Sequence, residues 1–287
     1  CAQAMQWAAS SPHAGLGYLA RQAIRAGWGK NNQVLNEALG MLRPYRLGPE
    51  DESIDSLYNR VVKEVDRQQQ SSDIDDIENF VPGQASDPES QRGLEELLQE
   101  GAALVREAGD EKWNLIQREL LEPAGEEKVG LFAQPIETVT ALARFLEKAT
   151  GKRPALIIGG QSDAERTKEV ASFWRPNGPQ YLVSSRAGGE GINLQVSRRL
   201  IHIDVPWNPM DMEQRVGRVH RFGSRETVIV DTVVVKDSRI KEQLSSTRMG
   251  RPPAPPGAAP AAPPPPPPSP ILQAPVVIAV CAELKKS

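Results

Sequence analysis

Two arginines and one glutamine in the stretch EQRVGRVHRFG (residues 213–223) have the types and the spacing to act on a phosphate group. Gln214, Arg218 and Arg221 stand at positions i, i+4 and i+7, which form one face of an α-helix. Each guanidinium is a rigid, planar fork of N–H donors that matches a phosphate. An arginine aimed at a phosphoryl group in transfer can raise the reaction rate about a thousandfold or more. The spacing fits triphosphate chemistry, and an arginine-rich helix face exposed to solvent explains it equally well.

The same stretch has the features needed to position that face. Asn208 followed by Pro209 is typical of a helix start, and Gly223 of a helix end. An apolar stripe on another face of this helix would be buried: Met212, Val216 and Val219.

A second stretch, SSRAGGEGINLQ (residues 184–195), directly follows the apolar run QYLVSS (residues 180–185). Three glycines after a strand would let the main chain approach a ligand closely. A glycine-rich turn taken alone is a weak signal.

Together these stretches resemble motifs V and VI of superfamily-two helicases. The lead-in PWNP (residues 206–209) is similar to the Swi/Snf-like branch, including its bacterial RNA-polymerase-associated members. The resemblance runs from about residue 128 to 244. Within it, GLFAQ (residues 130–134) resembles motif IV, and GGQSDAER (residues 159–166) resembles the segment before the second helix of this lobe.

The resemblance implies a RecA-like lobe and a role for particular residues. The arginines that reach ATP bound on a first lobe, with the motif VI glutamine, would be Arg218, Arg221 and Gln214. The motif V loop, which couples nucleotide to DNA, would contain Gly188, Gly189, Glu190, Gly191 and Asn193. Contacts to nucleic acid, or their support, would come from Gln134, Gly160, Gln161, Ser162, Ser184, Ser185 and Arg186. No metal ligand is expected from this chain.

Strands alternate with helices around these motifs, which predicts an α/β fold with a parallel sheet covered on both faces. The predicted strands are residues 128–134, 154–160, 180–185, 199–205 and 227–235. One predicted helix, residues 135–151, ends at Gly151, and the next begins at a capping box made by Ser162 and Glu165. Ligands of such sheets bind outside the carboxyl ends of the strands.

We therefore divide the chain into four parts. Residues 1–125 form an all-helical linker or insertion of amphipathic, solvent-facing helices. Within it, residues 50–127 hold 22 acidic and 7 basic residues. Residues 126–248 form the RecA-like domain. Residues 249–275 form a proline-rich, disordered tail, and residues 276–287 are left unassigned.

The sequence contains no G-x-x-x-x-G-K-[ST] phosphate loop, and it starts at Cys1 rather than methionine. These observations favour a C-terminal fragment of a longer or split ATPase. The composition is that of a soluble protein, with 39% hydrophobic and 25% charged residues. No apolar run is long enough to span a membrane, and the two cysteines lie at opposite ends, so a cytoplasmic protein is expected, nucleoid-associated if bacterial.

The leading hypothesis is the C-terminal motor lobe of an ATP-dependent DNA translocase, a helicase-like ATPase. It would use ATP with Mg²⁺ held mainly by a first lobe absent from this chain, so the chain alone would be inactive. Its partners would be duplex DNA, the missing lobe in cis or in trans, and RNA polymerase or another DNA-bound protein. The alternative is a non-catalytic module, derived from a helicase lobe, that binds nucleic acid or a protein.

Overall fold

The computed structural model describes residues 2–49, 51–70, 87–185, 193–205 and 229–234. The predicted arginine helix (208–223), most of the glycine-rich loop (186–192) and the proline-rich tail (249–275) lie outside the described residues.

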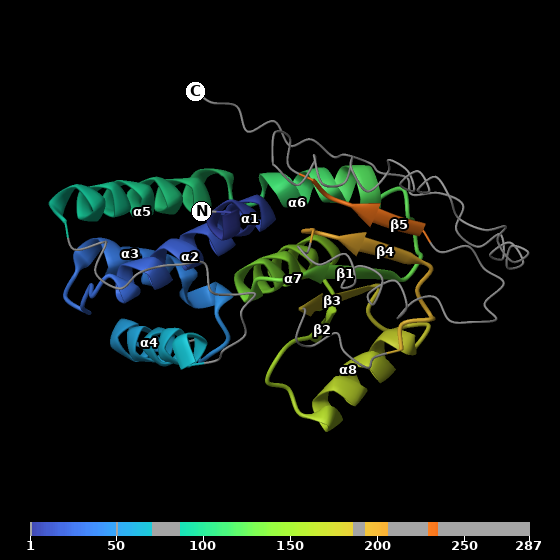
Figure 1. Ribbon diagram of the computed structural model, residues 1–287. Coiled ribbons are helices and arrows are strands. Elements are labelled where there is room, and N and C mark those ends of the chain that lie inside the picture. The colour runs from blue at the N-terminus through green and yellow to red at the C-terminus, as the bar shows by residue number, and fades with distance from the viewer. Residues whose placement is uncertain (1, 50, 71–86, 186–192, 206–228, 235–287) are drawn as a thin grey trace, which may run out of the picture.

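The described strands form one sheet in which every neighbouring pair is parallel, in the order β2-β3-β1-β4-β5 (Figure 1). The strands are β1 (Val129–Ala133), β2 (Ala155–Ile157), β3 (Tyr181–Ser185), β4 (Arg199–His202) and β5 (Ile229–Thr232). Every residue of β1 and β3 is buried, as expected for strands covered on both faces. The predicted α/β class and parallel sheet are confirmed.

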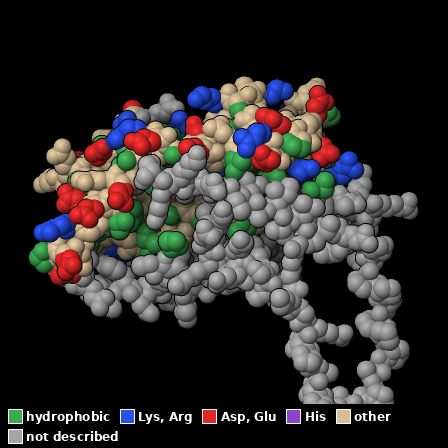
Figure 2. Space-filling view, turned by 90° about the horizontal axis from the view of Figure 1, so that it is seen from above, with side chains coloured by type: hydrophobic (Ala, Val, Ile, Leu, Met, Phe, Trp, Pro, Cys, Tyr) green, Lys and Arg blue, Asp and Glu red, His purple; other side chains and the backbone are tan. Residues whose placement is uncertain are grey.

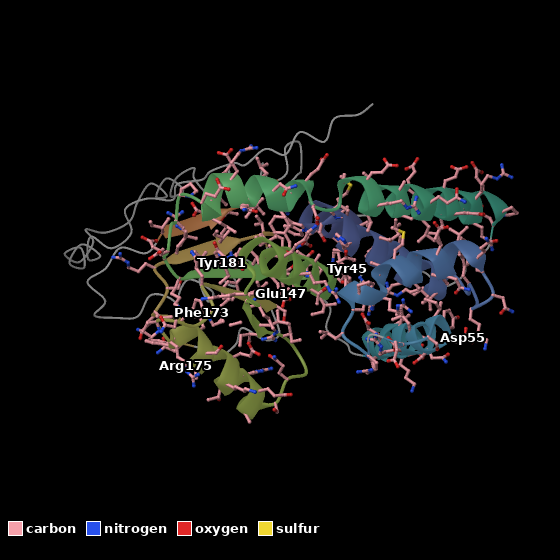
Figure 3. All side chains as sticks on the ribbon, turned by 180° about the vertical axis from the view of Figure 1, so that it is seen from behind. Tyr45, Asp55, Glu147, Phe173, Arg175 and Tyr181 are labelled. Atoms are coloured by element: carbon pink, nitrogen blue, oxygen red, sulfur yellow. The ribbon has the colours of Figure 1, made fainter. Side chains whose placement is uncertain are left out.

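Each face of the sheet packs against its own helices, because successive side chains of a strand point to opposite faces. Val129, Leu131 and Ala133 share a hydrophobic cluster with α7 (Ile136–Thr150). Phe132 instead packs with Phe173 of α8 (Asp163–Trp174), whose position at the end of α8 Figure 3 labels.

The predicted helix boundaries beside the sheet are confirmed by their caps. Gly151 ends α7 in the left-handed conformation with φ +68°, which a residue without a Cβ adopts at little cost. The capping box at the start of α8 has both of its bonds: the Ser162 hydroxyl accepts from the Glu165 N–H, and the Glu165 carboxylate accepts from the Ser162 N–H.

The core of the sheet also takes side chains from residues before 126. The helix α6 (Glu111–Ile116) continues into the π-helical turn η3 (Gln117–Leu121). Three of their side chains, Trp113, Ile116 and Leu120, lie at most 1% exposed in the cluster that contains β1 and α7. This packing joins residues 111–124 to the sheet.

The described residues before residue 110 are mostly helical, as expected, and their helices build a core of their own. It contains α1 (Ala2–Ser10), α2 (Pro12–Arg25), α3 (Gln33–Leu42), η1 (Arg43–Tyr45), α4 (Ile54–Gln70) and α5 (Pro88–Ala108). The helices are amphipathic, and their apolar sides enclose a cluster that includes Leu16, Leu35, Leu39, Leu57 and Leu98. Their polar sides face solvent: Figure 2 shows acidic and basic side chains interspersed with single hydrophobic ones.

Candidate nucleic-acid interface

The carboxyl ends of β1, β2 and β3 meet at one edge of the sheet. In the register, Ala133 pairs with Ser185, and Ile157 pairs with Ser184. The residues that follow these strands therefore lie along the same edge, where parallel sheets bind their ligands. This edge brings together six of the residues predicted to serve nucleic acid: Gln134, Gly160, Gln161, Ser162, Ser184 and Ser185.

The turn between β2 and α8 is held by the Gln161 side chain. Its Oε1 accepts from the Ile158 N–H at 2.9 Å, and its Nε2 donates to the Leu156 carbonyl at 3.0 Å. Gly160 is exposed, with φ +86°, and a Cβ there would meet nothing within 4 Å. Gln161 therefore shapes a turn whose exposed Gly160 backbone is accessible to a ligand.

Ser184 and Ser185 are buried, at 0% and 6% exposed. The Ser185 Oγ accepts from the Gly159 N–H at 3.3 Å, which ties β3 to the turn after β2. The Ser184 Oγ donates to the Ser185 carbonyl at 3.1 Å. In this structure both serines contribute to the internal bonding of the edge.

Asn193 lies at the other end of α8. Its backbone carbonyl accepts from Trp174 Nε1 at 3.1 Å, and Trp174 is the last residue of the helix that Ser162 caps. A 12-residue helix is about 18 Å long, so Asn193 is well separated from the edge. Its side-chain Oδ1 accepts from the Gln195 N–H at 3.0 Å, which stabilises a local turn.

The remaining predicted site residues lie outside the described part of the chain. They are Arg186, Gly188, Gly189, Glu190 and Gly191 of the glycine-rich loop, and Gln214, Arg218 and Arg221 of the arginine helix.

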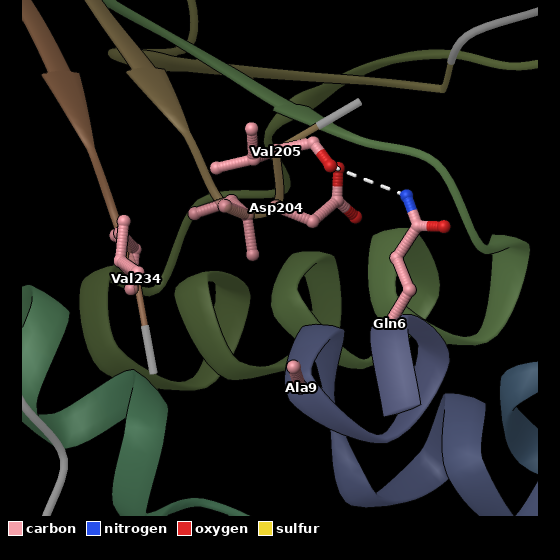
Figure 4. Close-up of a pocket in the computed structure, with 7 residues that line it drawn as sticks. Gln6, Ala9, Asp204, Val205 and Val234 are labelled. Carbon is pink, nitrogen blue, oxygen red and sulfur yellow. Dashed lines mark hydrogen bonds between the residues drawn. The ribbon is translucent and has the colours of Figure 1, made fainter. Parts of the chain in front are cut away.

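Gln134, at the end of β1, is held from two directions. Its backbone N–H donates to Asp204 Oδ2 at 2.8 Å, just beyond the end of β4. Its side-chain Oε1 accepts from Gln6 Nε2 of α1 at 3.0 Å. The same Gln6 nitrogen donates to the Val205 carbonyl at 3.2 Å, the bond drawn in Figure 4. The first helix of the chain therefore lies across the carboxyl ends of β1 and β4.

A second set of polar contacts fixes α1 in this place. The Ser10 hydroxyl donates to Asp204 Oδ2 at 2.8 Å and lies 2.8 Å from the Thr138 hydroxyl on α7. We refer to Gln6, Ser10, Gln134 and Asp204 as the edge network. Sequence reasoning missed Gln6, Ser10 and Asp204 as members, because their partners lie 70 to 199 positions away along the chain.

Lys112 links α6 to α1 and to the end of β4, beside the edge network. Its ammonium donates to the carbonyls of Ala9 at 2.9 Å, Ser10 at 2.7 Å and Ile203 at 2.9 Å. Burial lowers the pKa of Lys112 to about 8, and the nearby Asp204 carboxylate opposes that shift. At neutral pH the amine therefore carries its proton, and its three N–H donors match the three carbonyls.

A small hollow lies between α1 and the ends of β4 and β5 (Figure 4). Among the described residues that line it, the polar side chains are those of Gln6 and Asp204, and both already belong to the edge network. The residues that line it are Gln6, Ala9, Ile203, Asp204, Val205, Val233 and Val234.

The described residues contain neither a metal-binding cluster nor a membrane-spanning helix. No group of three or more His, Cys, Asp or Glu side chains there could hold a metal ion. No described helix has the length and apolar character needed to cross a membrane.

Comparison with known proteins identifies the segment that contains this edge. Residues 111–223 match the family model described as "Helicase conserved C-terminal domain". Over 57 residues the chain is 49% identical to "Uncharacterized ATP-dependent helicase YqhH" of Bacillus subtilis, covering 20% of this chain and 10% of that protein. Over 123 residues it is 34% identical to "RNA polymerase-associated protein RapA" of Vibrio campbellii, covering 42% of this chain and 13% of that protein.

The matched part of the chain thus spans about a tenth of the length of these two relatives. Among solved structures, the "Sulfolobus solfataricus SWI2/SNF2 ATPase core domain" aligns with a TM-score of 0.42 and 26% identity. That alignment covers 65% of this chain and 39% of the other.

Proposed function

We propose that this chain, which belongs to the superfamily-two helicases as a Swi/Snf-like C-terminal RecA-like lobe, is the second motor lobe of an ATP-dependent DNA translocase. The proposal rests on two findings that fall in the same segment of the chain. Residues 111–223 match the helicase C-terminal domain, and the structure gathers six predicted nucleic-acid residues at the carboxyl edge of the sheet inside that segment.

In this function the edge residues bind and orient the DNA backbone. The exposed Gly160 backbone and the partly exposed Gln134 amide would face phosphates, while Gln161 and the two serines hold the turns in shape. Neutral donors of this kind position a protein on nucleic acid without reading its sequence. Such contacts suit a motor that moves along duplex DNA of any sequence.

The nucleotide chemistry would be shared with a first lobe. ATP with Mg²⁺, held mainly by that lobe, supplies the free energy of hydrolysis. This chain would contribute Gln214, Arg218 and Arg221, whose spacing places two guanidinium groups and an amide on one helix face. Their positive charge would stabilise the charge that develops on the transferred phosphoryl group. The glycine-rich loop 188–191 would link the nucleotide to the DNA.

The proposed partners follow from the relatives. The RapA protein of Vibrio campbellii is named as RNA polymerase-associated, so RNA polymerase is a proposed partner of this chain as well. A lobe with this role would work where the DNA is, which in a bacterium is the cytoplasm and its nucleoid.

The test is to express the chain with a Swi/Snf-like first lobe and to measure DNA-stimulated ATP hydrolysis. Arg221→Ala is expected to lower kcat by about a thousandfold, because it removes charge from the phosphoryl group. Arg215→Ala is the matched control, since its position puts it on a different face of the predicted helix. Full activity in Arg221→Ala would contradict the assignment.

A second candidate, the non-catalytic module that binds nucleic acid or a protein, is favoured by the local basic charge of residues 186–225, which hold 7 arginines and 4 acidic residues. The chain would then bind duplex DNA with an affinity that falls as salt rises. The same reconstitution separates the two candidates, because the module predicts DNA binding and no ATP hydrolysis in the presence of a first lobe.

A further inference from the structure

The edge network fixes which atom of the Gln134 side chain is available to a ligand. We propose that Gln6 is a positioning residue that orients the Gln134 amide with its NH₂ donor toward the nucleic-acid backbone. This inference rests on the proposed function, because it assumes that a phosphate backbone lies along the carboxyl edge of the sheet.

The orientation of the Gln6 amide follows from a backbone carbonyl. The Val205 carbonyl can only accept a hydrogen bond, so the Gln6 atom that faces it at 3.2 Å must be the nitrogen. The two ends of a side-chain amide look alike, and the bonding partners decide which is nitrogen. An obligatory acceptor next to Gln6 therefore settles the assignment.

The Gln6 nitrogen then determines the orientation of Gln134. It lies 3.0 Å from the Gln134 side chain, where a donor requires an acceptor, so the facing atom must be Oε1. The Gln134 nitrogen consequently points away from Gln6. Gln134 is partly exposed, and the structure records no partner for its Nε2 within the described residues.

The chemistry of this remaining group matches a phosphate. The phosphate oxygens of nucleic acid act as hydrogen-bond acceptors. The NH₂ group of an amide can therefore form a favourable hydrogen bond to a phosphate, whereas the amide oxygen cannot. Without Gln6, the Gln134 amide could flip and present its Oε1, rather than its Nε2, to the phosphate.

Gln6 is itself held firmly enough to impose this orientation. Its side chain is buried, with 6% exposed. Its helix is fixed at the other end by the Ser10–Asp204 bond and by Lys112, which binds the carbonyls of Ala9 and Ser10. Asp204 also accepts the Gln134 backbone N–H, so one carboxylate positions both Gln134 and α1.

The test uses the full chain and a fluorescently labelled 20-base-pair duplex, with the dissociation constant measured by fluorescence anisotropy at fixed salt. In Gln6→Glu, a carboxylate that only accepts replaces the donor, so Gln134 must turn its NH₂ group inward. The expected loss of affinity is about three- to tenfold, the range for one hydrogen bond. Met5→Glu is the control, because it adds the same charge at the adjacent position, where the side chain is 67% exposed. It should change the affinity by less than about twofold.

A second variant guards against misfolding. Gln6→Met has a similar volume and no charge, and it leaves the Gln134 amide free to take either orientation. An affinity loss of about twofold is expected, with an unchanged circular dichroism spectrum. Wild-type affinity in a folded Gln6→Met protein would overturn the inference.

A double variant separates positioning from a general structural role. Gln134→Leu should weaken DNA binding by about three- to tenfold on its own. In that background, Gln6→Glu should weaken binding no further than Met5→Glu does, because the amide that it reorients is gone. Additive losses would overturn the inference, as would wild-type binding by Gln134→Leu. A wild-type chain that does not bind the duplex would instead contradict the proposed function.

Discussion

Two groups of buried polar contacts between the helical region and the sheet with its helices differ in charge: one is largely neutral and the other is ionic. The edge network is made of two side-chain amides, one hydroxyl and one carboxylate at the ends of β1 and β4. The second contact, which we call the ionic junction, lies only three residues further along, at Glu137 of α7. Its Oε1 accepts from Arg21 of α2 at 2.7 Å and from Arg46 at 2.5 Å, and Arg46 also pairs with Glu64 of α4.

The energetic difference follows from the charges. Glu137 is 0% exposed, and Arg21 and Arg46 are 2% and 7% exposed, so each charge depends on its partners for solvation. Burial alone would raise the pKa of Glu137, but the two arginines outweigh it and hold that pKa below its usual value. Each neutral bond in the edge network contributes about 0.5–1.5 kcal/mol and carries no charge that burial would penalise. The charges of the ionic junction therefore need one another, while the polar groups of the edge network are suited to binding a ligand.

Gly17 shows how closely the ionic junction is packed. A Cβ at Gly17 of α2 would lie 2.6 Å from Glu137 Oε1, which is far inside van der Waals contact. The absence of a side chain there lets α2 approach the α7 carboxylate.

The largest effect is expected from breaking the ionic junction. Among the described carboxylates, Glu137→Ala would leave the partly exposed Glu64 as the remaining ion-pair partner of two buried guanidinium groups, at an expected cost of about 3–5 kcal/mol in the free energy of unfolding. Urea denaturation of the variant and the wild type measures this difference in the free energy of unfolding. Glu147→Ala is the control, because Glu147 is exposed on the same helix (Figure 3) and should change stability by less than about 0.5 kcal/mol. A cost below about 1 kcal/mol for Glu137→Ala would remove the distinction between the two contacts.

The next effect depends on pH and on His13, which lies beside the ionic junction. Burial lowers the pKa of His13 to about 4, although Asp110 and Glu137 oppose the shift. The unfolded chain then takes up a proton near its ordinary pKa of 6.5, while the folded chain does not. Stability should therefore fall by up to about 3 kcal/mol as pH drops from 6.5 to 4.

His13→Phe tests that pH dependence, because it keeps a ring against Tyr45, whose centroid lies 4.1 Å away, and removes the titrating nitrogens. Urea unfolding at several pH values should show a flatter profile between pH 6.5 and 4.5 in the variant. Below about pH 4.5 a further loss should remain in both proteins, because the unfolded chain then protonates Glu137 while the folded chain, in which the pKa of Glu137 is lowered, keeps it ionised. Parallel profiles for the variant and the wild type would show that His13 does not titrate in this range.

The smallest effect is expected at the support of the edge network. Lys112→Met removes three donors and keeps most of the side-chain volume, at an expected cost of about 1–3 kcal/mol. The loss should be local, so hydrogen exchange should speed up in α1 more than in α5. An equal change in both helices would mean that Lys112 stabilises the helical region as a whole, and that the edge network has no separate support.

Local patterns in the sequence were sufficient to predict much of the lobe. The strands read as apolar runs, Gly151 marked the end of α7, and the Ser162–Glu165 spacing marked the start of α8, because each of these features acts within a few residues. The family resemblance added the edge residues Gln134 and Gly160, whose shared position the parallel register then explains.

In the helical region, local sequence patterns predict the helices but not how they pack. Its helices were recognisable from their periodicity, but periodicity gives only the apolar side of a helix and not its partner. That Arg21 and Arg46 would meet at Glu137 could not be read from the chain, because those pairs are separated by 116 and 91 residues.

The sequence by itself determined the elements of this protein, since capping, strand periodicity and helix-ending glycines are local interactions. Only the tertiary structure decided that α1 crosses the carboxyl edge of the sheet and that Gln6 meets Gln134. Contacts between distant segments depend on how whole surfaces fit together, and the orientation of a single amide depends on the one carbonyl, that of Val205, placed beside it.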